Sequence, residues 1–150
     1  MFDETFRICF ADTPFGVALH QRIRFQVYRL DKGYTIPCKE HDDSGSFSTE
    51  RETDAWDDHS AHFIVQNKKT RQWVAATRVV LPKLGAGLPV DALGAFDRHL
   101  LEKPDVAAGE ISRFCIIGNR SKVTTANTIR PDDDSLESWG IGALGKHQQF

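Results

Sequence analysis

The spacing of hydrophobic residues in the first part of the chain predicts a strand followed by an amphipathic helix. Residues 6–11 are apolar with weak alternation, which is typical of a short strand. Thr13 and Pro14 follow as a helix N-cap and a proline at the first helical position, where its missing N–H is not needed. Apolar residues then recur every three or four positions as far as Leu30, and Gly33 stands where a C-terminal cap belongs. We therefore expect a helix with one buried face.

Two apolar runs in the middle of the chain predict an antiparallel hairpin. Residues 62–66 and 73–81 contain β-branched side chains and are separated by the turn-like segment 67–70. The preceding residues, 34–58, are acidic and rich in Ser, Thr and Asp, and they show no sustained periodicity. We expect a long loop there, and loops of that length in compact domains are usually functional or disordered.

The second half of the chain predicts one more helix and one more strand. Residues 90–101 have helical spacing, and residues 110–117 have the pattern of a strand. Residues 121–138 have the composition of a flexible segment. The order of elements predicts an α/β (α+β) fold with a mixed, mainly antiparallel sheet and flanking helices. We expect no domain boundary before residue 118.

Composition and charge exclude several classes of protein. The 150 residues are 40% hydrophobic and 27% charged, which suits one globular domain with its own core. The formal net charge of -2 creates no field that would favour nucleic acid or an anionic membrane. No apolar run approaches the roughly 18 residues that a membrane-spanning helix needs. Three cysteines in dissimilar contexts favour a reducing compartment, so we expect a cytoplasmic protein without a disulfide framework.

Two charged residues lie within the last predicted strand. Alternation places Glu110 and Ser112 on one face, and Ile111 and Arg113 on the other, unless a bulge redirects one of them. Charges in a half-buried strand need partners or a solvated cleft. A functional site and a structural Arg–Glu ion pair both satisfy that need.

The predicted long loop contains a pair of aspartates beside an aromatic ring. Asp54 and Asp57 flank Trp56, an arrangement that suits a cationic or ammonium group. Glu52 and Asp58 lie nearby, so a solvated acidic loop is the alternative.

Two arginines lie in elements that are expected to be partly buried. Arg78 falls inside an apolar strand, where a guanidinium needs a carboxylate or an anionic ligand. Arg24 falls on the first helix, where it could also be a surface residue that stabilises the helix through its neighbours.

A metal site has little support in the sequence. Cys38-x-x-His41 and His59-x-x-His62 could be combined into a zinc site, but no second cysteine pair or HExxH helix accompanies them. We expect exposed loop histidines, an incidental thiol and no metal, with Cys115 a small core residue. Nucleophile-elbow, Walker and dinucleotide-binding motifs are absent from the sequence.

The charged residues form an ordered series along the chain. The series is Arg24-Phe-Gln-Val-Tyr28, Asp54-x-x-Asp57, Thr77-Arg78 and Glu110-x-x-Arg113-Phe114. Over residues 6–117 this order resembles the acyl-homoserine-lactone (autoinducer) synthases. The phrasing is more similar to a related group, the PEP-CTERM/exosortase system-associated acyltransferases, which contains N-acyl amino acid synthases. The segments that carry this second similarity are Arg24-Phe-Gln-Val-Tyr28, Asp57-Asp-His-Ser-Ala-His-Phe63, Arg78-Val-Val-Leu-Pro82 and Gly109-Glu-Ile-Ser-Arg-Phe114.

This resemblance implies a GNAT-like acyltransferase fold that lacks its C-terminal half. Tyr28 and Tyr34 stand where autoinducer synthases usually have Phe and Trp, which keeps an aromatic wall. The family continues after the fourth strand with a helix and further strands. We therefore expect residues 1–118 to be the N-terminal part of the domain. Residues 119–150 would be a flexible or partly ordered connection toward the missing half.

The resemblance also implies an activity and roles for individual residues. A fatty acyl group would pass from an acyl carrier protein or acyl-CoA to the amine of an amino acid or related small metabolite, with no permanently bound cofactor. The implied catalytic residues are Glu110 and Arg113, the substrate-binding residues are Arg24, Asp54, Asp57 and Arg78, and the acyl pocket contains Tyr28 and Phe114. The alternatives are a non-catalytic acyl-binding or interaction protein with this fold, or an autoinducer synthase. An ordinary acetyl-CoA N-acetyltransferase is disfavoured because its phosphate-binding loop is not recognisable.

Overall fold

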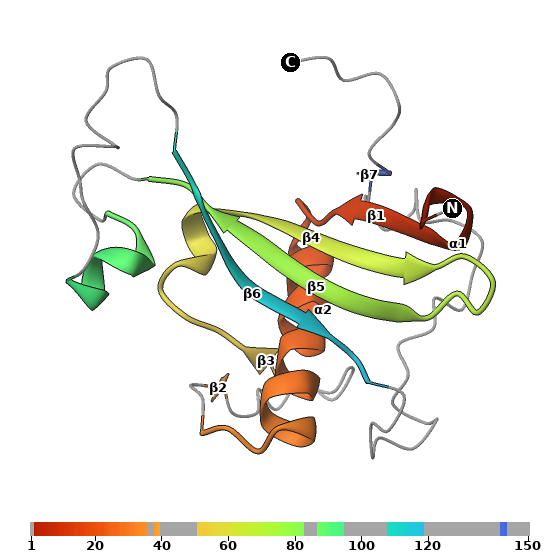
Figure 1. Ribbon diagram of the computed structural model, residues 1–150, viewed down its shortest axis with the longest axis horizontal. Coiled ribbons are helices and arrows are strands. Elements are labelled where there is room, and N and C mark those ends of the chain that lie inside the picture. Colours follow the sequence, from red (N-terminus) through yellow and green to blue (C-terminus); the bar gives the residue numbers. More distant parts are fainter. Residues whose placement is uncertain are drawn as a thin grey trace.

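A five-stranded antiparallel sheet with one helix across its face forms the centre of the protein. The computed structural model describes residues 2–35, 38–39, 51–82, 87–94, 108–118 and 142–143. The strands lie in the order β6-β5-β4-β1-β7. Their bounds are β1 Phe6–Phe10, β4 Ser60–Asn67, β5 Trp73–Val80, β6 Glu110–Ile116 and β7 Gly142–Ala143. Helix α2 (Pro14–Phe25) crosses one face of this sheet (Figure 1). The expected mixed α/β fold with a mainly antiparallel sheet is confirmed.

The first strand and helix begin as the sequence predicts. A short helix, α1 (Phe2–Thr5), precedes β1. The Thr13 side chain caps α2 by accepting a hydrogen bond from the Gly16 N–H at 3.1 Å. The helix continues as a π-helix, η1 (Gln26–Asp31), and ends near Gly33, whose φ of 70° is the left-handed conformation of a helix cap. The predicted N-cap and C-terminal glycine are both confirmed.

The predicted hairpin is confirmed, whereas the predicted long loop is partly wrong. Strands β4 and β5 pair antiparallel, and the register places His62 opposite Arg78. Within residues 34–58, β2 (Cys38–Lys39) pairs with β3 (Arg51–Glu52), and a 3₁₀ helix, η2 (Asp57–His59), follows. Strands of two residues are too short to produce a detectable alternation, so the periodicity of the sequence does not reveal them.

The second half of the chain agrees with the predictions in part. The predicted helix 90–101 begins as a 3₁₀ helix, η3 (Pro89–Leu93), which ends at Gly94, and residues 95–101 lie outside the described residues. The predicted last strand is β6. Most of residues 119–150 also lie outside the described part. The exception is β7, which was not expected from the sequence and which pairs with β1.

The hydrophobic core lies between α2 and the sheet. It contains Leu19 and Ile23 from the helix, and Cys9, Ile64 and Cys115 from three strands, all with at most 3% of their surface exposed. Full burial of a leucine or isoleucine side chain, as at Leu19, Ile23 and Ile64, stabilises the fold by about 1.5–3 kcal/mol each. Cys115 is thus the small core residue that was expected, and burial raises the pKa of its thiol to about 11.

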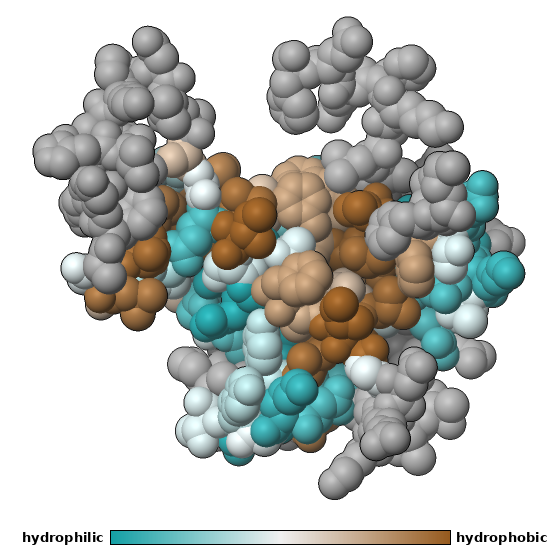
Figure 2. Space-filling view, viewed as in Figure 1, coloured by the Kyte–Doolittle hydropathy of each residue, from teal (hydrophilic) through white to brown (hydrophobic). Residues whose placement is uncertain are grey.

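The other face of the sheet presents hydrophobic side chains to its surroundings. Ile8, Ile111, Phe114 and Ile116 are all large, apolar and exposed. Figure 2 views this face and shows hydrophobic residues gathered over the strands. Among the described residues, no helix combines the length and the apolar character that crossing a membrane requires.

Replacing the cap of α2 tests the local signal that starts the helix. Thr13→Ala removes the acceptor for the Gly16 N–H, so the free energy of unfolding should fall by about 1 kcal/mol. Urea denaturation followed by circular dichroism measures the change. Thr13→Ser keeps a hydroxyl acceptor and should stay close to the parent protein; an equal loss in both variants would contradict the capping role.

Candidate active site

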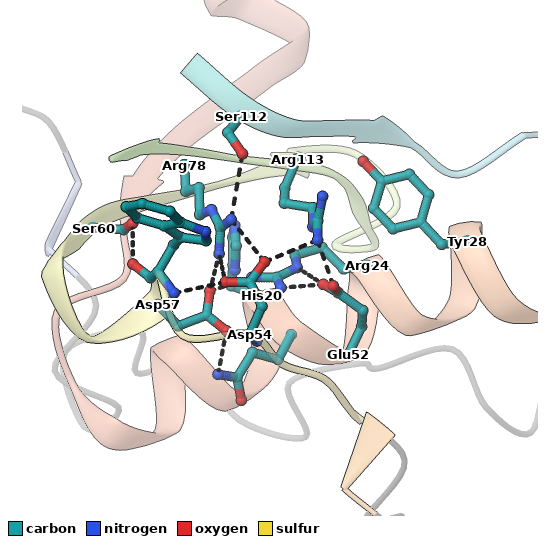
Figure 3. Close-up of polar contacts among 12 residues, drawn as sticks. His20, Arg24, Tyr28, Glu52, Asp54, Asp57, Ser60, Arg78, Ser112 and Arg113 are labelled. Atoms are coloured by element: carbon teal, nitrogen blue, oxygen red, sulfur yellow. Dashed lines mark hydrogen bonds and ion pairs between the residues drawn. The ribbon is translucent and has the colours of Figure 1, made fainter. Parts of the chain in front are cut away.

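Three arginines and three carboxylates from distant parts of the chain meet beside α2 and form one charged network (Figure 3). The arginines come from three elements, whereas the carboxylates all come from one short segment. The members are Arg24 on α2, Arg78 on β5, Arg113 on β6, Glu52 at the end of β3, Asp54, and Asp57 in η2. The formal charge of the six side chains sums to zero.

The turn that carries the two aspartates is organised by their own side chains. The Trp56 N–H donates to Asp54 Oδ1 at 2.9 Å, and the Asp54 N–H donates to Asp57 Oδ2 at 3.2 Å. Ser60 Oγ donates to the Trp56 carbonyl at 2.6 Å. Aspartate commonly stabilises turns by such local bonds. The local sequence therefore folds the turn and aims both carboxylates toward the sheet.

Arg24 is fully buried, so its interpretation as a surface residue is wrong. Its guanidinium contacts the Glu52 carboxylate, and its Nη1 donates to Asp57 Oδ1 at 2.5 Å. Neither Arg24 nor Glu52 has any exposed surface. An uncompensated charge would be very costly in this position, so the burial of each residue depends on the other.

Arg78 finds the carboxylate partners that its place in an apolar strand predicts. It holds Asp54 with two parallel bonds, from Nη1 to Oδ1 at 2.6 Å and from Nη2 to Oδ2 at 2.8 Å. Nη1 also donates to Asp57 Oδ1 at 2.6 Å. Nη2 lies 3.4 Å from Ser112 Oγ on β6. Two-pronged contacts of this kind are among the stronger charge-assisted hydrogen bonds.

A bulge in β6 brings Arg113 into the network. Ala76 pairs with Cys115 and Arg78 pairs with Ser112, so two residues of β6, Arg113 and Phe114, lie opposite one residue of β5. Arg113 has a φ of 54°, which is unusual for a residue other than glycine. The bulge redirects its side chain, which donates from Nε to Glu52 at 3.1 Å and from Nη2 to Asp54 at 2.9 Å. Arg113 therefore forms its ion pairs with Glu52 and Asp54, and not with Glu110 of its own strand.

The network keeps its aspartates ionised despite their burial. Burial acts to raise the pKa of Asp57, but the Arg24 guanidinium, the Asp54 N–H and Arg78 outweigh it and hold the pKa at about 2. Burial also acts to raise the pKa of Asp54, and Arg78 again outweighs it, so that pKa is lowered. Both oxygens of each aspartate accept hydrogen bonds, with Gln21 as a further donor to Asp57. The interpretation as a solvated acidic loop is therefore wrong.

Glu110 lies at the start of β6, outside the charged network. Its Oε2 accepts a hydrogen bond from the Val90 N–H at 2.7 Å, and among the described residues it forms no ion pair with an arginine. The register places Glu110 on the same face as Ser112. Two residues of strand separate it from Arg113, and three steps along a strand span on the order of 10 Å. It also lines a pocket of about 450 Å³ together with Leu88, Pro89, Val90, Leu93, Ala108 and Gly109.

Tyr28 and Phe114, the residues expected in an acyl pocket, are in contact beside the bulge. Tyr28 Oη donates to the Phe114 carbonyl at 3.3 Å. The Tyr28 ring stacks on Tyr34 with their centroids 6.4 Å apart, and the Phe114 side chain is exposed. Partial burial raises the pKa of Tyr28, so its hydroxyl remains a donor at neutral pH.

Three polar residues of this region were missed or misjudged from the sequence. Glu52 was considered only as part of an acidic loop, and His20 was not singled out. His62 was expected to be an exposed loop histidine, but it is a buried residue of β4. A signal for His20 exists in the sequence, because it precedes Arg24 by one helical turn and both lie next to the apolar positions of the helix.

The described residues contain no group of three His, Cys, Asp or Glu side chains arranged to hold a metal. His20 and His62 contact each other instead, with their Nδ1 atoms 3.2 Å apart. The Cys38 side chain and His41 lie outside the described residues.

Comparison with known proteins connects this site to one family. The family model of the acetyltransferase (GNAT) domain matches residues 23–128, a range that contains all six members of the network and Glu110. Comparisons with curated proteins and with solved structures found no match.

Removing the central arginine tests whether the network stabilises the fold. Arg78→Met leaves Asp54 and Asp57 without their main partner, so the free energy of unfolding should fall by about 3–5 kcal/mol. Arg29→Met, at an exposed arginine on η1, should change it by no more than about 0.5 kcal/mol. Urea denaturation of both variants measures the difference, and similar small losses would show that the network contributes little.

The lowered pKa values predict how stability depends on acid. The pKa of Asp57 falls from 3.8 to about 2 on folding, so the unfolded chain binds more protons in that interval. Its contribution to stability is therefore fully present above pH 3.8 and is lost as the pH falls toward 2. Urea denaturation at a series of pH values should show a weaker acid dependence in Asp57→Asn than in the parent protein. An unchanged slope would contradict the assignment.

Proposed function

Because this chain belongs to the acetyltransferase (GNAT) domain family, we propose that it transfers a fatty acyl group from an acyl thioester to the amine of an amino acid or a related small metabolite. Enzymes of this family use acyl-CoA as a co-substrate and need no permanently bound cofactor. In our proposal the donor is acyl-CoA or an acyl carrier protein. The observation that carries the proposal is the bulge in β6. At this bulge the regular pairing of the strand is interrupted, and Arg113 joins the charged network.

The bulge supports acyl transfer because it removes backbone groups from regular strand pairing. Attack of an amine on a thioester produces a tetrahedral oxyanion, which needs hydrogen-bond donors held in place beforehand. Arg113 and Phe114 lie together opposite Thr77, so one of the two has no regular partner across the ladder. We assign the oxyanion site to the backbone N–H groups of this bulge.

Glu110 is the base that we propose for the amine. An amino acid carries an ammonium group at neutral pH, which must lose a proton before the nitrogen can attack. The Glu110 carboxylate accepts one backbone hydrogen bond through Oε2, and among the described residues Oε1 has no partner. It would take the proton through bridging water molecules, because Glu110 lies on the order of 10 Å along the strand from Arg113, where we place the acceptor. The C–N bond then forms, the C–S bond breaks, and the thiolate leaves and is protonated.

The exposed edge of the network is where we place the acceptor. The Arg113 side chain is 35% exposed, whereas Arg24 and Arg78 are almost completely buried. Arg113 can therefore hold an acceptor carboxylate directly, and Asp54 lies beside it for the ammonium group. Arg24, Asp57 and Arg78 are buried, so in this proposal they do not touch the acceptor. They contribute to its binding by holding Asp54 and Arg113 in position.

The acyl chain of the donor would lie beside the aromatic residues of the bulge. Phe114 and its neighbour Ile116 present exposed apolar side chains on β6, and Tyr28 contacts the Phe114 backbone. Apolar surface next to the reacting carbonyl would favour a fatty acyl group over a short one, because each buried methylene contributes about 0.8 kcal/mol.

The decisive experiment combines a product assay with a substitution of the proposed base. The protein is incubated with acyl-CoA or acylated carrier protein and a panel of amino acids, and N-acyl products are measured by mass spectrometry. Glu110→Gln should reduce the rate about 100-fold or more while the circular dichroism spectrum is unchanged. Asp58→Asn, at an exposed carboxylate of η2, is the control and should retain the rate.

Two outcomes would contradict these assignments. A normal rate for Glu110→Gln would remove that residue from the mechanism but leave the reaction intact. Failure of the parent protein to form a product with any donor and acceptor would overturn the proposed function and favour a non-catalytic acyl-binding protein.

A further inference from the structure

Two buried histidines link the turn that carries Asp57 to the strand residue opposite the bulge. His20 on α2 has no exposed surface, and His62 on β4 has 4%. Their Nδ1 atoms are 3.2 Å apart, and their rings meet edge to face. His62 Nε2 lies 3.0 Å from the Asp57 carbonyl oxygen, and His20 Nε2 lies 3.1 Å from the Thr77 carbonyl oxygen. The two rings thus form a continuous chain of polar contacts from η2 to β5.

The number of hydrogens that this chain of contacts needs differs from the number that two neutral rings carry. Each of the three contacts requires one hydrogen, because a carbonyl oxygen and an unprotonated ring nitrogen can only accept. Two neutral imidazoles supply two N–H groups, so one contact is left with two lone pairs facing each other. One extra proton completes all three contacts. A second extra proton would place two N–H groups against each other across 3.2 Å.

Burial and the charges around the pair together decide when that extra proton binds. Arg24 on α2 and Arg78 on β5 disfavour it, whereas Asp57 on η2 favours it. Glu52 on β3 forms an ion pair with Arg24. Burial is the largest influence and lowers the pKa of both rings, that of His20 to about 2. The pair is therefore neutral at neutral pH and gains its proton only below the ordinary histidine pKa of 6.5.

We propose that His20 and His62 act as one unit, which binds a single proton and positions the turn that carries Asp57. In the protonated unit, hydrogen bonds run without interruption from the Asp57 carbonyl to the Thr77 carbonyl. In the neutral unit one of the three is absent, so the turn is tethered less firmly to the strand opposite the bulge. The histidines are positioning residues, since neither ring is exposed to a substrate. Only the consequence for acyl transfer rests on the proposed function.

Nuclear magnetic resonance of the ¹⁵N-histidine-labelled protein tests the shared proton directly. The ring nitrogens are followed from about pH 8 down to about pH 4, the range in which histidine charge changes. The Nδ1 signals of His20 and His62 should move together with one midpoint below 6.5, and the two rings should gain one proton in total. Separate midpoints, a full proton on each ring, or a pair that stays neutral until the protein unfolds would each overturn the proposal.

Glutamine variants assign the signals and break the unit without removing both tethers. Glutamine can place an amide N–H near the position of Nε2, so His20→Gln and His62→Gln each keep a bond to a carbonyl but lose the shared proton. In each variant the remaining histidine should titrate without coupling. His59 lies in η2, the 3₁₀ helix that also contains Asp57, but it is outside the histidine pair. His59→Gln should therefore leave the coupled titration unchanged. If the glutamine variants do not fold, the titration of the parent protein decides alone.

The positioning role requires a measurement that a change in proton binding alone would not affect. His62→Ala removes the tether to Asp57 and should shift the guanidinium ¹⁵N signals of Arg24 and Arg78, which both contact that aspartate. His62→Gln should restore them toward the parent values, and equal shifts in both variants would contradict positioning through the Asp57 carbonyl. A coupled titration in a protein without acyl transfer would refute the proposed function only, whereas independent titrations in an active protein would refute the pair only.

Discussion

The structure depends on the compensation of charge in a network whose centre has almost no water-exposed surface. Three guanidinium groups and three carboxylates meet there, and Arg24 and Glu52 are completely buried. A single unpaired ion in such a place would cost several kcal/mol. The buried members, Arg24, Glu52, Asp57 and Arg78, can therefore stay buried only while their partners stay in position. Because the arginines come from α2, β5 and β6, this requirement fixes the segment 52–57 against both the helix and the sheet.

The same requirement explains how an unusual backbone conformation persists in β6. A positive φ at a residue other than glycine costs on the order of 1–3 kcal/mol, and it persists only where the surroundings hold it. Arg113 is held by Glu52 and Asp54, which also place it at the exposed edge of the network. Bulge, network and histidine pair meet around Thr77. That residue lies opposite the bulge, and its carbonyl contacts His20.

Several features of the protein could be predicted from short stretches of sequence. Thr13 and Pro14 start α2, Gly33 ends the helical segment, and two apolar runs with β-branched residues form the hairpin of β4 and β5. These predictions hold because hydrogen bonds and side-chain direction within one element depend on residues a few positions apart. The need of Arg78 for a carboxylate could also be predicted, because a guanidinium in an apolar strand has few other solutions.

The sequence by itself thus determined the main helix and the longer strands, the family resemblance and which charged residues needed partners. Only the tertiary structure decided the partners themselves. It joined Arg113 to Glu52 and Asp54 and left Glu110 to the backbone of Val90. It also buried His62 against His20, although 42 residues separate them. The physical reason is that an ion pair or a shared proton depends on distance in space, and here that distance was set by the packing of α2 and by one extra residue in β6.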